Sequence, residues 1–271
     1  IKSYTKISNI RFVPFGRSVL IEMLDYVTEE PFSRSRYTTN PLISETQGGL
    51  LLTYLLAAER GRSVLRTNYE EQNLFIPLLQ GRLNVRKDQS IQYNKWDGSS
   101  SPLGIASALA TEVTGFLLPF LTLQEDGVFL VEEPEAQLHP AAQFLMGMTL
   151  VVLAKIKGVK IVLTTHSDII LSTISLLIQN KPNYQKIVKV LQKILPAEIV
   201  NQYETIIQDF SKRLSESSKT IDVKAYWYKD EGNAREIPIE NLGKEIPSIT
   251  QVYETIASWG LSLSYSKDSE S

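Results

Sequence analysis

The chain has 271 residues, 43% of them hydrophobic and 21% charged, proportions typical of a globular protein with enough length for a buried core. Its 28 basic and 30 acidic residues give a formal net charge of −2, which excludes a global basic field that would attract nucleic acid or anionic lipid. The absence of cysteine excludes disulfides, thiolate metal sites and cysteine nucleophiles. No uninterrupted apolar stretch of membrane-spanning length and no signal peptide stands out, so we expect a cytoplasmic protein with no membrane partner.

The N-terminal region predicts a strand, a turn and a helix. The strand ends at Val13 and is followed by a turn that contains proline and glycine. Ser18 is then a candidate N-cap for a helix over residues 19–27. Arg17 could reach a phosphate from this turn, although an arginine here more often pairs at a helix start. Residues 28–41 are rich in Thr, Ser, Pro and Arg and predict a loop.

The next region combines helices with a hairpin. Helices are expected over residues 42–61 and 69–79. Residues 81–93 alternate between apolar and polar side chains around a polar turn at residues 87–89, which is typical of a β-hairpin. Residues 96–104 predict a loop by composition.

The most informative stretch is a short apolar run, residues 128–131, that leads into Glu132 and Glu133. Such a run is typical of a strand buried on both faces, and Pro134 ends it because proline cannot donate to a β-ladder. Parallel sheets place ligands at the carboxyl ends of their strands. Two adjacent carboxylates repel one another, and a divalent cation would relieve that repulsion. The alternative is that the acidic pair simply begins a solvated loop.

A second short strand is predicted over residues 160–163, where it runs into a Thr-Thr-His-Ser sequence. Between the two strands, residues 141–156 are apolar and long enough for one helix. A strand–helix–strand unit of this length is a right-handed crossover, which sets the ends of two parallel strands side by side. The two histidines of the chain, His139 and His166, follow these two strand ends.

The C-terminal region is predicted to be helical and then to form a hairpin. One helix is expected over residues 168–178, and one or two amphipathic helices over residues 183–217, broken near Pro196. Residues 221–239 predict a β-hairpin. A last helix is expected over residues 249–258, before a polar end.

The sequence of residues 128–140, Val-Phe-Leu-Val-Glu-Glu-Pro-Glu-Ala-Gln-Leu-His-Pro, resembles the Walker B and D-loop segment of ABC-type ATPase heads. The resemblance is to the RecF, SMC and OLD-like branch of the AAA ATPases, and Leu-Thr-Thr-His-Ser at residues 163–167 is similar to their switch-histidine motif. It implies an α/β fold, the C-terminal part of a P-loop NTPase, with a mainly parallel sheet flanked by helices, a helical insertion and a C-terminal hairpin. The implied division is a head over residues 1–180, with its insertion at about residues 42–98, and a helical segment with a hairpin over residues 181–271.

This resemblance implies roles for the residues at both strand ends. Glu132 would bind Mg²⁺ directly or through water, although most Walker B motifs have Asp at this position. Glu133 would orient and deprotonate the attacking water, and His166 would contact the γ-phosphate of ATP. Gln137 and His139 belong to the D-loop, so they would lie at a dimer interface and connect two nucleotide sites.

A further position resembles the ABC signature. Residues 106–123 predict a long apolar helix, and Ser107 at its start matches the serine that contacts ATP held by the opposite subunit. Helix N-termini offer free N–H groups and the positive end of the helix dipole to a phosphate. Many signatures carry glycine after the serine, where this chain has Ala108 and Leu109, so a simple helix N-cap is the alternative. Glu112 matches an acidic position a few residues on.

The sequence contains no phosphate-binding loop of the form Gly-x-x-x-x-Gly-Lys-Ser/Thr. Its one Gly-Lys pair, Gly243–Lys244, is followed by Glu245 and has no glycine five places before its own. We therefore expect the lobe that carries this Walker A loop to belong to the same polypeptide or to a partner.

Three functions stay open at this stage. The first is an ATP-hydrolysing switch, a homodimer that encloses two ATP molecules with Mg²⁺ and acts on DNA or an effector protein in DNA repair, maintenance or anti-phage defence. The second is a degenerate ATPase-like module that lacks its own phosphate loop and regulates a partner. The third is a metal-dependent hydrolase using Glu132, Glu133, His139 and His166, a spacing unusual for metal ligands. No nuclease-like tail follows the head, so we expect no nuclease activity.

Overall fold

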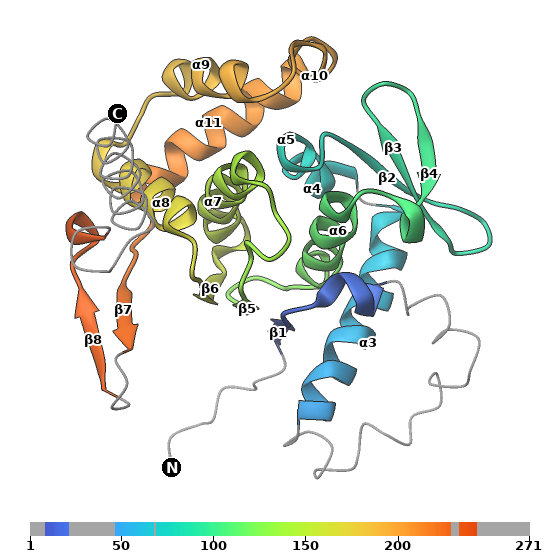
Figure 1. Ribbon diagram of the computed structural model, residues 1–271, viewed down its shortest axis with the longest axis horizontal. Helices are drawn as coiled ribbons and strands as arrows, with labels where there is room; N and C mark the ends of the chain where they lie inside the picture. Colours follow the sequence, from blue (N-terminus) through green and yellow to red (C-terminus); the bar gives the residue numbers. More distant parts are fainter. Residues whose placement is uncertain (1–8, 22–46, 68, 229–232, 243–271) are drawn as a thin grey trace, which may run out of the picture.

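The sheet at the centre of the fold has three parallel strands, in the order β1 (Ile10–Val13), β5 (Val128–Glu132) and β6 (Lys160–Thr164) (Figure 1). The structure is a computed structural model, and it describes residues 9–21, 47–67, 69–228 and 233–242. Helix α7 (Pro140–Lys155) joins β5 to β6, and this crossover places the carboxyl ends of both strands side by side. The expected α/β class, with a parallel sheet flanked by helices, is confirmed.

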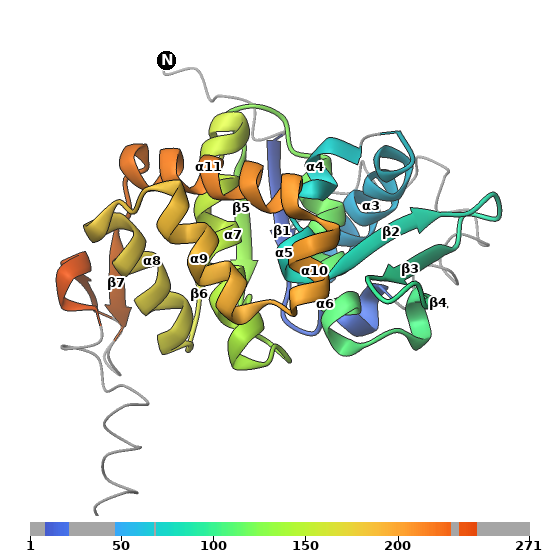
Figure 2. The same cartoon turned by 90° about the horizontal axis from the view of Figure 1, so that it is seen from above.

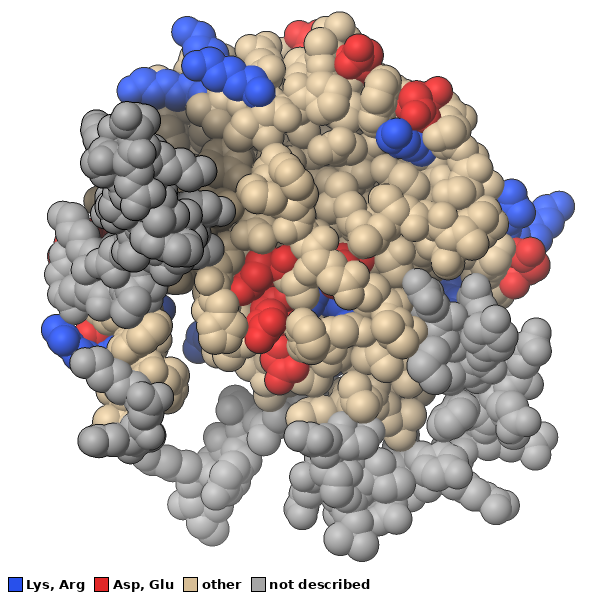
Figure 3. All heavy atoms as spheres, viewed as in Figure 1, with Lys and Arg blue, Asp and Glu red and all other residues tan. Residues whose placement is uncertain are grey.

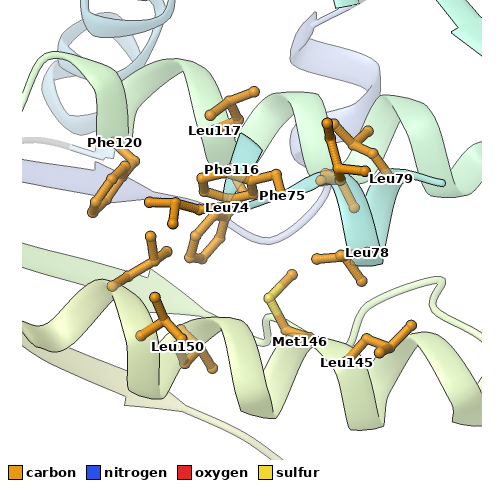
Figure 4. Close-up of a cluster of buried hydrophobic side chains, with 14 of the residues drawn as sticks. Leu74, Phe75, Leu78, Leu79, Phe116, Leu117, Phe120, Leu145, Met146 and Leu150 are labelled. Carbon is orange, nitrogen blue, oxygen red and sulfur yellow. The ribbon is translucent and has the colours of Figure 1, made fainter. Parts of the chain in front are cut away.

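The apolar core lies against one face of this sheet. Phe129 of β5 is fully buried on that face, whereas Val162 of β6, on the other face, is 57% exposed. The core is formed with α7 and with α6 (Ala108–Leu121), whose apolar side chains meet in Figure 4. The ring centroids of Phe116 and Phe120 in α6 lie 4.9 and 5.7 Å from that of Phe129, in the edge-on arrangement that aromatic pairs prefer. This packing anchors the strand that ends in the acidic pair.

Residues 47–79 supply three helices. Helix α3 (Gln47–Leu65) packs along α6, and both helices contact β1. Two short helices follow, α4 (Tyr69–Asn73) and α5 (Ile76–Leu79), so the prediction of one helix over residues 69–79 was wrong. Pro77 lies in the first turn of α5, where its missing N–H is tolerated, whereas in the middle of one helix over residues 69–79 it would remove a backbone hydrogen bond and clash with the preceding turn.

A small antiparallel sheet follows these helices. Strands β2 (Gly81–Val85) and β3 (Ile91–Lys95) confirm the predicted hairpin. The chain then forms a third strand, β4 (Ser100–Pro102), paired with β3, and a 3₁₀ turn, η2 (Leu103–Ile105). The loop predicted for residues 96–104 was wrong in this part, because its serines complete the ladder of β3.

The N-terminal helix begins two residues earlier than predicted. Residues 17–21 are helical, so Ser18 lies in the first turn and is not the residue before the helix. The rest of the helix predicted over residues 19–27, and the loop predicted over residues 28–41, lie outside the described residues.

The C-terminal elements form a further layer of helices and a hairpin. They are η3 (Ile156–Gly158), α8 (Asp168–Asn180), α9 (Tyr184–Ile194), α10 (Ala197–Gln202), α11 (Glu204–Thr220), β7 (Ala225–Tyr228), β8 (Ala234–Ile237) and η4 (Ile239–Asn241). Figures 1 and 2 show α9 and α11 on the side of α7 that faces away from the sheet, and α11 contacts both α7 and α9. The predicted break near Pro196 and the antiparallel hairpin are confirmed. The helix predicted over residues 249–258 lies outside the described residues, and the division at residue 180 stays a prediction.

One segment, Pro140–Gly158, is long and apolar enough to cross a membrane by length and composition, with a mean hydropathy of 1.3. Gln143, Lys155 and Lys157 interrupt this segment, so it does not contradict the expectation that no uninterrupted apolar stretch reaches that length. In the fold, 56% of this segment's apolar window is buried, and α7 packs against α8, α11 and β6. Its apolar character is explained by this position in the core.

Candidate active site at the ends of β5 and β6

Glu132 is the last residue of β5 and lies opposite Thr164, the last residue of β6. Its Oε2 accepts a hydrogen bond from the backbone N–H of Phe15, in the turn after β1, at 3.1 Å. The side chain is otherwise exposed, so the carboxylate retains lone pairs for a ligand or a cation. Figure 3 shows acidic side chains gathered near the middle of the molecular face, over the region where β5 and β6 end.

Glu133 and His166 face each other across the two strand ends. Glu133 Oε1 lies 3.7 Å from His166 Nε2, with the side chains 38% and 87% exposed. This distance is too long for a direct hydrogen bond, but a water molecule or a phosphate oxygen could contact both groups. The backbone N–H of Glu133 donates to the carbonyl oxygen of Thr164 at 3.0 Å, which ties the turn to β6.

The backbone of Glu133 has a φ of 41°, in the left-handed region that residues other than glycine rarely adopt. Such conformations cost about 1–3 kcal/mol and persist only where the surrounding structure enforces them. In this chain the conformation turns the glutamate out of the strand direction and toward His166.

Glu135 is a member of the site that the sequence reasoning missed. Its Oε1 accepts a hydrogen bond from the backbone N–H of His166 at 2.6 Å, so it fixes the loop that carries the histidine. Its Oε2 is buried and has no hydrogen-bond partner among the residues that the structure describes. The signal was present in the sequence, because Glu135 is a third carboxylate within the same acidic motif.

The loop between Glu133 and α7 carries the next two predicted residues, both of them exposed. Gln137 has a φ of 58°, and its Nε2 donates to Ser18 Oγ at 3.4 Å. His139 is the N-cap of α7, where its Nδ1 accepts from the N–H of Ala141 at 3.4 Å. The Nε2 atom of His139 takes no part in this cap.

Ser107 lies on a different element from the other predicted residues. It is the N-cap of α6, and its Oγ accepts from the N–H of Ala110 at 3.3 Å. The capping role that the sequence left open is therefore present. Ser107 and Ala108 are both exposed at this helix N-terminus, so a ligand could approach the free N–H groups there.

Arg17 does not face a ligand. Its side chain is 0% exposed, which excludes the phosphate contact and favours the structural role considered from the sequence. Burial lowers the pKa of Arg17, and the nearby carboxylate of Glu112 opposes that shift.

Residues 115–171 match the family model described as an AAA ATPase domain. Over these residues the chain is similar to an AAA ATPase domain. The match covers about a fifth of the chain, from within α6 to the start of α8, and confirms the resemblance to AAA ATPases. No curated protein and no solved structure matches the chain.

The matched residues include the whole acidic turn and His166, whereas Ser107 precedes them. Within the described ranges, no three His, Asp or Glu side chains converge as metal ligands, so the four-residue hydrolase site finds no support. Mg²⁺ keeps several waters and is commonly held by one or two carboxylates together with phosphate oxygens. The exposed carboxylate of Glu132 fits that requirement.

Proposed function

We propose that this chain is the C-terminal portion of an ATP-hydrolysing head, with its catalytic residues at the ends of β5 and β6. The observation that carries the proposal is the Glu133–His166 pair, whose side chains lie 3.7 Å apart just beyond the ends of two adjacent parallel strands, within the segment that is similar to an AAA ATPase domain. A carboxylate and an imidazole at this separation can hold a water molecule between them, next to the position where a phosphate would bind.

Each residue of the turn has a distinct part in this proposal. Glu133 accepts a proton from the attacking water and orients it, while His166 donates a hydrogen bond to the terminal phosphate. Glu132 holds Mg²⁺, which when bound neutralises charge on the phosphates. Glu135 acts through His166, because its hydrogen bond to the backbone of that residue sets the position of the imidazole.

In this proposal the phosphate-binding loop comes from outside the printed sequence, and the free edge of β6 favours its docking there. In the part of the chain that the structure describes, β6 pairs only with β5. A groove of about 430 Å³ lies along that edge, between β6, α7 and residues 220–224. An unpaired strand edge is a template for another strand. A strand added parallel to β6 would end beside His166, where the phosphates are needed.

The same proposal includes a nucleotide-dependent dimer. Ser107, Gln137 and His139 are exposed, as residues that meet a second head across ATP must be. ATP would favour the closed dimer and hydrolysis would release it, so that nucleotide binding drives a switch acting on DNA or an effector protein in the cytoplasm.

The second candidate is a catalytically degenerate module that regulates a partner. The observation that favours it is the lack of a Gly-x-x-x-x-Gly-Lys-Ser/Thr loop in the sequence. The candidate predicts a folded protein that binds its partner and never hydrolyses ATP.

The test is Mg²⁺-dependent ATP hydrolysis by this chain alone and by the polypeptide with its upstream sequence restored. Activity is expected only in the restored form, and Glu133→Gln is expected to abolish it. Glu125→Gln is the matched control, because Glu125 is exposed and precedes β5 at the opposite end of the strand. Hydrolysis in neither form would favour the degenerate module, and full activity of Glu133→Gln would reject the site.

A further inference from the structure

The guanidinium of Arg17 is buried beneath the turn at the end of β5, residues 132–134. It donates hydrogen bonds to the backbone carbonyl groups of that turn. Nη1 donates to the carbonyl oxygens of Pro14, Glu132 and Glu133 at 3.4, 3.1 and 3.4 Å. Nη2 donates to those of Glu133 and Pro134 at 3.3 and 3.1 Å. One side chain therefore binds three consecutive carbonyl groups, those of the turn that carries both acidic residues.

The same guanidinium is joined to the middle of α6. Arg17 Nε lies 3.0 Å from Glu112 Oε2, and both side chains are 0% exposed. Arg17 Nε and both carboxylate oxygens of Glu112 have no hydrogen-bond partner among the described residues, so the contact is an ion pair in which Arg17 supplies the positive charge next to this buried carboxylate. A charge buried this deeply is costly unless it is paired. The site is also tightly packed, since a Cβ added at Gly115 would lie 3.1 Å from Arg17 Cγ.

We propose that Arg17 is a positioning residue for Glu133, and that Glu112 in turn orients Arg17. This inference rests on the function proposed above. Glu133 adopts a left-handed backbone conformation that it would not choose unaided, and its carbonyl oxygen accepts from both terminal nitrogens of Arg17. Because the planar guanidinium presents its donors in a fixed fork, it holds the carbonyl groups of the turn in one arrangement.

The arrangement also connects two parts of the proposed site. Ser107 starts α6 and Glu112 lies in the same helix, so Arg17 is the direct link between the helix that would meet the partner's nucleotide and the turn that would activate water. A small displacement of α6 would be transmitted to Glu133 through a buried ion pair and the carbonyl contacts.

The test uses the complete ATPase polypeptide and the variant Arg17→Lys. Lysine keeps the positive charge beside Glu112 but lacks the fork of donors. Because misplacement of a catalytic group by about 1 Å can cost ~100-fold in rate, kcat is expected to fall by about 10- to 100-fold, with the KM for ATP changed less than about threefold. Arg213→Lys is the matched control, because Arg213 is half exposed and pairs with Asp209 within α11. Unchanged kcat in Arg17→Lys would overturn the proposal.

If Arg17→Lys does not fold, as judged by circular dichroism and gel filtration, Glu112→Gln takes its place. This variant keeps the size and shape of the side chain but removes the charge that orients Arg17, so the guanidinium is expected to lose its fixed alignment with the carbonyl groups of the turn. A loss of kcat at constant KM supports the proposal, and a folded variant with unchanged kcat overturns it.

A second measurement does not depend on ATP hydrolysis. Amide hydrogen exchange of residues 133–138 reports the order of the turn, because the N–H groups of Glu133, Ala136 and Leu138 donate within it or to β6. In Arg17→Lys, exchange is expected to rise by roughly tenfold in this segment and to stay unchanged in α11. Unchanged exchange in the turn would overturn the proposal even if the wild type proved inactive, so its failure is distinguishable from failure of the proposed function.

Discussion

Gly61 is expected to be the least replaceable glycine of the core, because α3 and α6 approach each other at this position. A Cβ built on Gly61 would lie 2.0 Å from the carbonyl oxygen of Leu118 and 2.8 Å from its Cα. The obstacle is backbone, so Gly61→Ala must move α3 away from α6. Overpacking of this kind costs about 1–3 kcal/mol or more, whereas alanine gains about 1 kcal/mol over glycine in a helix interior. Because the contact of 2.0 Å is with backbone, we take the upper end of that range, about 3 kcal/mol, and expect a net loss of about 2 kcal/mol in the free energy of unfolding.

The assay is urea denaturation of the wild type, Gly61→Ala and Gly104→Ala. Gly104 is the matched control, because nothing lies within 4 Å of a Cβ at that position and its backbone conformation is an ordinary one. We expect Gly104→Ala to stay within about 0.5 kcal/mol of the wild type. If Gly61→Ala were instead more stable by about 0.5–1 kcal/mol, as for a solvent-exposed helical glycine, the close approach of α3 and α6 would be refuted.

Two further predictions concern the site and a surface turn. Glu133→Gln in the complete protein is expected to accumulate an ATP-bound dimer by light scattering, since hydrolysis would no longer release it; a monomer in saturating ATP would contradict the trans arrangement. Hydrogen bonds from Ser99, followed by Lys95, lower the pKa of Asp97 to about 2. The stabilisation this gives is present above the unfolded-state pKa and is lost as pH falls through about 2. Ser99→Ala is expected to raise this pKa toward 3.8, which an NMR titration of the carboxyl carbon would detect.

The position of the acidic turn after β5 could be predicted from the sequence because its signals are local. A short apolar run, two carboxylates and a proline indicate a strand that stops, and the helix to the next strand fixes which ends meet. The distance between Glu133 and His166 follows from that topology. Local signals also predicted the β2–β3 hairpin, because apolar and polar side chains alternate along its two strands.

The sequence could not predict features that depend on contacts between distant residues. Arg17 and Glu112 are 95 positions apart, and nothing near either residue indicates that the two charges pair in the core. The strand β4 is polar and only three residues long, so only its pairing with β3 identifies it as a strand. The roles of Ser107, Gln137 and His139 stay predictions, because they concern a second molecule and a nucleotide.

Because Glu133 has a left-handed backbone conformation, a substitution at this position can raise stability and at the same time lower the proposed activity. Glycine or asparagine adopts this conformation at lower cost, so Glu133→Gly is expected to relieve local strain while it removes the proposed general base. Random mutagenesis of this protein with selection for heat resistance alone would therefore enrich inactive sequences at residue 133. Keeping glutamate at this position requires selection on turnover itself.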